Sequence, residues 1–339
     1  MNNIENENIP EGENIPEGEN ISIMEEGTGD DAVELNGSWE QKGRSITAAA
    51  VSGLLGIGVI YFNAQSILAA LFVFIYTLIF NAEPPENIAN NLSAAINTYK
   101  TPLLLAIVLS QYLFMLLPAF WVVKKWHTKK SFKYLRIRNF SVKESVFAVL
   151  ITISLLPFCY FISYLLMDLF EIPEIFRSMG EELFTAHSFS EFLVLVFVVA
   201  VTPAICEEIF FRGYVQRTLE RTAGMKSFII TGIIFGLFHM QPLGLITLSI
   251  LGVLFSFFYY RSKSIFPSAA AHFTNNLIAL ILLYSQTQSG TIQISADGNI
   301  PVFWVIASLI LAGILIYLYI KITEIPYEER QLNRNYFRW

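Results

Sequence analysis

Charged side chains are scarce in this sequence. Of its 339 residues, 15% are charged and 54% are hydrophobic, whereas a soluble domain needs more polar residues to cover its core. Four stretches contain no charged residue: 45–82, 101–123, 145–167 and 192–206. About 20 apolar residues are enough to cross a bilayer, so this distribution excludes an ordinary soluble globular domain.

The second half of the chain continues the pattern, with apolar segments at 227–241, 243–260, 264–285 and 301–320. Together with the first four stretches, they predict an all-α integral membrane protein with about eight transmembrane helices. A polar break at 63–66 leaves open whether the first stretch forms one helix or two.

Cysteine is almost absent as well. Cys159 and Cys206 are the two in the chain, and both lie inside predicted spans, where a thiol is most simply a small buried apolar group. A fold built on disulfides is therefore not indicated.

Basic side chains are missing from the first 41 residues, which hold 12 acidic ones. The tandem hexads "ENIPEG" are rich in Glu, Asn, Pro and Gly, and this composition cannot bury enough apolar surface to fold. Residues 1–43 are therefore predicted to form a disordered acidic tail.

The basic residues are concentrated on one side of the predicted membrane. With eight spans, 20 of the 22 Lys and Arg residues fall on the side that holds both termini, and the positive-inside rule makes that side cytoplasmic. We therefore expect a multi-pass protein of the cell membrane that contacts membrane lipid. Nucleic acid is not expected as a partner.

Ionisable residues inside spans are rare and are functional by default, because each is costly in hydrocarbon. They form three groups on three predicted helices: Glu207, Glu208 and Arg212; then His239; then His272 with Asn275 and Asn276. His127 and His187 fall in loops and are predicted to be ordinary solvated histidines.

Spacing predicts how the first group is arranged. Ser188 resembles a helix N-cap and Gly224 a helix end, so one long helix is expected to begin near 189 and to run to 224. Glu208 and Arg212 are four residues apart and share a face, which suits an ion pair. Glu207 lies about 100° round the helix, so it is left without that partner.

These residues form three recognisable motifs. "EEIFFR" resembles the EExxxR motif of the CAAX protease and bacteriocin-processing family of intramembrane endopeptidases, "FGLFH" its FxxxH motif and "HFTNN" its HxxxN motif. The resemblance covers a four-helix catalytic core at 188–285. Residues 44–187 then hold three N-terminal spans, and 286–339 hold the last span and a cytoplasmic tail.

The resemblance implies a role for each matching residue. Glu207 would be the general base and would act with His239 on a water molecule. His272 and Asn276 would hold the oxyanion of the tetrahedral intermediate, while Glu208 and Arg212 would form a supporting pair. The substrate would be a peptide or a membrane protein, and the substrate's identity, including any prenyl group, stays open.

Several alternatives stay open at this point. A zinc enzyme could use Glu207, His239 and His272 as ligands, although the chain has no HExxH motif and the resemblance favours a mechanism without a cofactor. A transporter or proton relay could use the same buried groups. A non-catalytic scaffold, such as a bacteriocin-immunity protein, would need none of the chemistry.

Overall fold

The computed structural model describes residues 25–26, 33–81, 92–138, 141–169, 182–242, 244–289 and 300–323. Within these ranges, seven helices are long and apolar enough to cross a membrane, and a shorter apolar helix lies where the sequence predicts a span at 227–241. The all-α membrane fold is thus confirmed. The same ranges hold one antiparallel pair of two-residue strands, β1 (Glu25–Glu26) and β2 (Val33–Glu34).

The first apolar stretch forms one helix, α2 (Ile46–Phe80), and is not divided. At its polar break, the Asn63 side chain donates to the Val59 carbonyl (2.8 Å) and the Ser66 hydroxyl to the Phe62 carbonyl (3.0 Å). Because these polar groups bond to the backbone one turn earlier, the helix continues through them.

The second span is built from several segments, in which the label η marks a π-helical stretch with a wider turn than the α-helix. The second span combines α3 (Leu92–Gln111), η2 (Tyr112–Leu116), α4 (Leu117–Val122) and η3 (Val123–His127). After the short α5 (Ser131–Tyr134), α6 (Val142–Leu169) forms the third span.

The fourth span is continuous from Phe189 to Ala223, as its predicted ends require. It combines α8 (Phe189–Leu195), η4 (Val196–Val201), α9 (Thr202–Glu207), η5 (Glu208–Gln216) and α10 (Arg217–Ala223). The Ser188 hydroxyl caps the start by accepting from the Glu191 N–H (3.2 Å), and Gly224 ends the helix at φ 53°, which glycine adopts without strain.

A helical hairpin follows, made of α11 (Lys226–Phe238) and α12 (Leu245–Ser262). At 1.5 Å per residue, the 13 residues of α11 rise about 20 Å, less than the roughly 30 Å of bilayer hydrocarbon. The two helices pack closely because Gly232 faces the α12 backbone; a Cβ there would lie 2.3 Å from the Val253 nitrogen. The helix is therefore too short to cross the hydrocarbon by itself, and it ends beside the residues discussed below.

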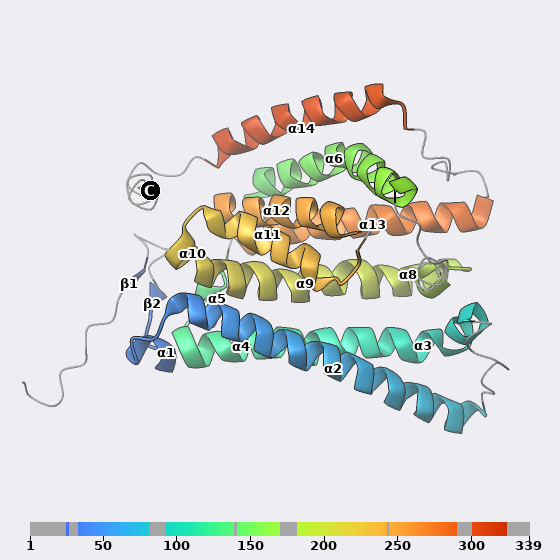
Figure 1. Cartoon of the computed structure of the whole chain (residues 1–339), viewed down its shortest axis with the longest axis horizontal. Helices are drawn as coiled ribbons and strands as arrows, with labels where there is room; N and C mark the ends of the chain where they lie inside the picture. The colour runs from blue at the N-terminus through green and yellow to red at the C-terminus, as the bar shows by residue number, and fades with distance from the viewer. Residues whose placement is uncertain are drawn as a thin grey trace, which may run out of the picture.

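The last two spans are α13 (Ile265–Ser289) and α14 (Val302–Ile322). Figure 1 shows α14 along one outer edge of the bundle and α2 with α3 along the opposite edge, with α8, α9, α12 and α13 between them. Many large apolar side chains of α2 and α14 are exposed, among them Leu55 at 61% and Ile310 at 59%. Outer faces of this kind suit contact with lipid chains.

The structure differs from the sequence prediction at the end of the acidic tail. Residues 33–40 are packed: Val33 and Leu35 are buried in the core, and Glu40, in helix α1 (Ser38–Gln41), bonds to His127 (2.6 Å) and to Arg221 (2.5 Å). His127 is therefore buried and ion-paired, not solvated. The overall composition of the tail gives no sign of these few apolar and charged residues that pack against the helices. Residues 1–24 and 27–32 of the tail lie outside the described residues.

Candidate active site

The two adjacent glutamates lie at the junction of α9 and η5. Glu207 is the last residue of α9 and Glu208 the first of η5, so their side chains leave the helix in different directions. The Glu208 side chain is fully buried, whereas the Glu207 side chain keeps 12% of its surface exposed. The two carboxylates consequently have different surroundings.

Glu208 is the centre of a buried polar cluster. Its Oε1 accepts from Arg212 Nη1 (2.7 Å) and lies 2.8 Å from His272 Nδ1, while its Oε2 accepts from the Ser268 hydroxyl. The ion pair that the four-residue spacing predicts is therefore present. The link to His272 ties the fourth span to α13.

Arg212 extends this cluster to the hairpin. Its Nη2 donates to the Gly252 carbonyl of α12 (3.2 Å), and its guanidinium lies 4.3 Å from the centre of the Phe235 ring of α11. A buried cation is tolerated only with such partners, because its transfer from water is costly. Glu208 and Arg212 thus connect four helices through contacts within the membrane-spanning part.

Glu207 has a more open environment. Its Oε2 lies 3.9 Å from His239 Nε2, too far for a direct hydrogen bond. That oxygen is buried and has no hydrogen-bond partner within the described part of the chain. A buried carboxylate oxygen without a donor is unusual and marks a position where a further molecule can bind.

His239 is held at the end of α11 by its own backbone. The helix stops at this residue, since Met240 has a φ of 49° and Pro242 follows two residues later. His239 Nδ1 lies 2.7 Å from the Phe235 carbonyl oxygen. A carbonyl can only accept, so Nδ1 carries a proton, and Nε2 faces Glu207 as the ring nitrogen that can accept a hydrogen bond when the ring is neutral.

His272 and Asn276 lie one turn apart on α13. Asn276 Nδ2 donates to the Val199 carbonyl of η4 (2.8 Å), and its Oδ1 accepts from Asn275 Nδ2 (3.1 Å). The Val199 bond uses one of the two N–H groups of the Asn276 amide. The same bond fixes the position of the amide relative to the fourth span.

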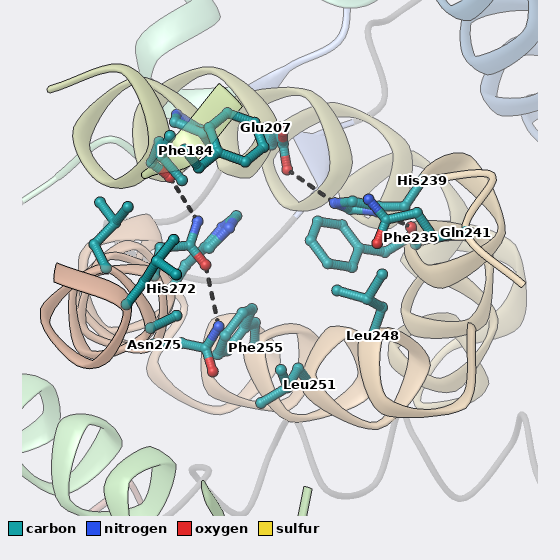
Figure 2. Close-up of a pocket in the computed structure, with 16 residues that line it drawn as sticks. Phe184, Glu207, Phe235, His239, Gln241, Leu248, Leu251, Phe255, His272 and Asn275 are labelled. Atoms are coloured by element: carbon teal, nitrogen blue, oxygen red, sulfur yellow. Dashed lines mark hydrogen bonds and ion pairs between the residues drawn. The ribbon is translucent and has the colours of Figure 1, made fainter. Parts of the chain in front are cut away.

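One pocket of about 360 Å³ is lined by Glu207, His239, His272 and Asn276, the four residues that the sequence motifs single out. The structure therefore brings together residues up to 69 positions apart. Figure 2 shows the Glu207 carboxylate directed at the His239 ring, with Leu248 and Leu251 on the opposite side of the pocket. Its remaining lining is mostly apolar, apart from Gln241 and Asn275.

The three ligands of the zinc alternative are not grouped as one set. Glu207 Oε2 and His239 Nε2 lie 3.9 Å apart, whereas His272 Nδ1 bonds to Glu208. Across the ranges that the structure describes, no three His, Cys, Asp or Glu side chains are grouped so that they could hold a metal ion. No reaction step through zinc is therefore derived from this arrangement.

Sequence reasoning missed Ser268, which lies one turn before His272 and bonds to Glu208. It named Asn275 but did not predict its bond to Asn276. It also did not predict that the Phe235 carbonyl orients His239. Ser268 shares a helical stripe with His272 at a spacing of four, a signal that could have identified it; the backbone carbonyl leaves no such signal.

The fold and this pocket define a multi-pass α-helical membrane protein with a carboxylate–histidine site between its helices. Comparison with known proteins then gives the family of the central segment. Residues 189–278 match the family model described as type II CAAX prenyl endopeptidase Rce1-like. The match confirms the resemblance that the three motifs indicate, over the helices that carry the pocket.

A curated relative supports the same relationship. Over 112 residues the chain is 29% identical to the Bacillus subtilis (strain 168) protein named "Putative membrane peptidase YdiL". The aligned part covers 31% of this chain and 46% of that protein, so the match spans about half the length of the relative. No solved structure matches the chain.

Proposed function

We propose that this protein is an intramembrane endopeptidase, which hydrolyses a peptide bond in a membrane-associated protein or peptide. The family of residues 189–278 and the peptidase named among the relatives support this class of reaction. The observation that carries the proposal is the pair of acceptor atoms, Glu207 Oε2 and His239 Nε2, 3.9 Å apart in one pocket.

Two acceptors at this separation are suited to a water molecule. A water about 2.8 Å from each atom can donate one hydrogen to the carboxylate and the other to the imidazole. Glu207 then takes the proton as the water oxygen bonds to the scissile carbonyl carbon. When the C–N bond breaks, the proton passes to the leaving amine, as in general acid–base catalysis.

Asn276 and His272 would stabilise the charge that develops on the carbonyl oxygen. Asn276 has a second N–H besides the one bonded to Val199. It lies one helical turn from His272, and both residues line the pocket. His272 donates to Glu208 through Nδ1, so it can donate to an oxyanion through Nε2 only when doubly protonated. The Glu208 carboxylate supports that protonated form, which makes Glu208 a positioning residue.

The test is cleavage by the purified protein in liposomes. Probes are a farnesylated CAAX peptide and an unmodified set of membrane-binding peptides, incubated in H₂¹⁸O and analysed by mass spectrometry. We expect new carboxylates that carry ¹⁸O with wild type, with or without a chelator, and none with Glu207→Gln. A transporter or scaffold would cut neither probe class, and equal cleavage by Glu207→Gln would also overturn the proposal.

We also propose that both termini face the cytoplasm. The ends of α1, α10 and α14 gather at one end of the bundle in Figure 1, which is the end that carries most of the basic residues. In intact cells, a cysteine introduced at Asn299 should react with an impermeant thiol reagent, and one introduced at Lys129 should not. Reversed labelling would contradict this orientation.

A further inference from the structure

A second pocket, of about 500 Å³, adjoins the first. We call it the α2-side pocket: five residues of α2 and Met240 line it, namely Tyr61, Phe62, Gln65, Ser66, Ala69 and Met240. Glu207 and His239 line both pockets. The first, here the α13-side pocket, is completed by α12 and α13, so the carboxylate–histidine pair stands where the two cavities meet.

The two pockets differ in their chemistry. Aliphatic and aromatic side chains such as Leu248, Leu251 and Phe255 dominate the α13-side pocket. In the α2-side pocket, Gln65 Oε1 is buried without a hydrogen-bond partner within the described residues. A buried amide oxygen that accepts no hydrogen bond costs free energy, so this oxygen is suited to an N–H group of a bound molecule.

Endopeptidase chemistry needs two such spaces. A bond inside a polypeptide has chain on both sides, and successive extended residues rise about 3.3 Å each. If the scissile carbonyl lies at the Glu207–His239 pair, the two chain directions must leave toward different cavities. The α2-side pocket and the α13-side pocket offer these two directions, and the unpaired Gln65 oxygen lies on the α2 side.

We propose that the α2-side pocket is a substrate subsite for the polypeptide on one side of the scissile bond, where Gln65 accepts a backbone N–H. The α13-side pocket takes an apolar side chain from the other side. This inference rests on the proposed function and extends it, because α2 (Ile46–Phe80) lies outside the segment that matches the family model. Residues outside the matched segment thus set part of the specificity.

A matched pair of pocket-filling variants tests the assignment. Ala69 lines only the α2-side pocket and Ala279 only the α13-side pocket of the two. The cleavage sites of wild type, Ala69→Phe and Ala279→Phe are compared on one peptide library. We expect each variant to change residue preferences on one side of the cut by about tenfold or more, and the two variants on opposite sides.

A second pair of variants tests the hydrogen bond. Gln65→Leu should raise KM with little change in kcat, because it removes a contact made before and during reaction. Gln111→Leu is the control: Gln111 also has a buried side-chain oxygen without a partner in the described structure, but it lines neither pocket. Thermal unfolding in detergent should be similar for Gln65→Leu and Gln111→Leu.

The failures are distinguishable. A wild-type protein that cuts no peptide contradicts the proposed function. If the wild-type protein cleaves peptides, but the two pocket-filling variants change residue preferences on the same side of the cut or on neither side, only the subsite assignment is overturned. A benzophenone peptide bound to Glu207→Gln should crosslink to α2 from one side of the bond and to α13 from the other; displacement of both crosslinks by lipid alone would show a lipid cavity instead.

Discussion

Glu207 and Glu208 are neighbours in the sequence with opposite environments. Around Glu208, three donors from two spans satisfy a fully buried carboxylate: Arg212 of the fourth span, and Ser268 and His272 of α13. Around Glu207, the ion-pair partner within the described residues is His239, whose Nε2 lies 3.9 Å away, beyond hydrogen-bond distance. The comparison shows how one helix turn can hold both a structural carboxylate and a reactive one. The Glu208 carboxylate has its hydrogen-bond acceptors occupied, whereas one oxygen of the Glu207 carboxylate has no hydrogen-bond donor within the described residues.

The largest effect is expected on the cleavage rate, from a change at the Glu207–His239 pair. Replacing His239 with Ala should lower the cleavage rate by about 10²–10⁴, the range of general acid–base catalysis. Combining it with Glu207→Gln should add little, because residues that act on one water are not additive. Steady-state cleavage of the best peptide measures this; two independent, multiplying losses would show that the pair does not share a water.

Changes in the cluster around Glu208 should lower the stability of the fold instead. Arg212→Ala leaves the Glu208 carboxylate buried without its main cation, and breaking a buried pair typically costs about 3–5 kcal/mol. Unfolding in mild detergent should show a loss of that size. The control is Arg138→Ala, since Arg138 donates to the Lys263 carbonyl near the surface and its loss should cost much less. Equal stability of the two variants would contradict the structural role of Arg212.

A smaller effect is expected at the oxyanion position. Asn276→Ala should lower kcat by about 10²–10³ with little change in KM, as for a donor that acts mainly in the transition state. Asn275→Ala is the comparison, because Asn275 orients Asn276 through one hydrogen bond and its loss should be milder. A raised KM with an unchanged kcat in Asn276→Ala would place this amide in substrate binding instead.

The smallest effect concerns the ion pair at the end of the bundle. Burial alone would raise the pKa of Glu40, but hydrogen bonds and charges from His127 and Arg221 lower it from 4.5 to about 2. The stabilisation is therefore present above pH 4.5 and is lost as the pH falls toward 2. Glu40→Gln should cost about 1–3 kcal/mol at neutral pH, and unfolding at several pH values measures how the difference shrinks.

Glu34→Gln is the control for that measurement, since the Glu34 carboxylate bonds the neutral amide of Asn36 (3.2 Å). Its stability should follow wild type across the same pH range. A pH-independent loss in Glu40→Gln would show that packing, and not charge, holds residues 33–40 in place.

Much of this fold follows from the sequence, because hydropathy and helix-end residues act locally. The apolar stretches, the cap at Ser188 and the end at Gly224 all predict what the structure contains. Local signals do not give depth, however. The segment 227–241 looks like a full span, yet α11 stops at residue 238, where a left-handed Met240 and the nearby Pro242 end the helix.

The residues that line the pocket could be selected from the sequence, but the contacts between them could not. The motifs select Glu207, His239, His272 and Asn276, but spacing within one helix cannot give the rotation of one helix against another. His272 therefore bonds to Glu208, a contact that no spacing rule predicts. The burial of His127 likewise depends on a partner 87 residues away in sequence, Glu40.

The most direct test of the contrast between the two glutamates is to measure cleavage and unfolding on Glu207→Gln and Glu208→Gln in one preparation. Glu207→Gln should lose cleavage and keep the unfolding midpoint of wild type, because it removes a base and preserves shape. Glu208→Gln should unfold at a clearly lower temperature, because it strands the Arg212 guanidinium. Cleavage by Glu207→Gln near the wild-type rate, with Glu208→Gln as stable as wild type, would contradict the assignment of both residues.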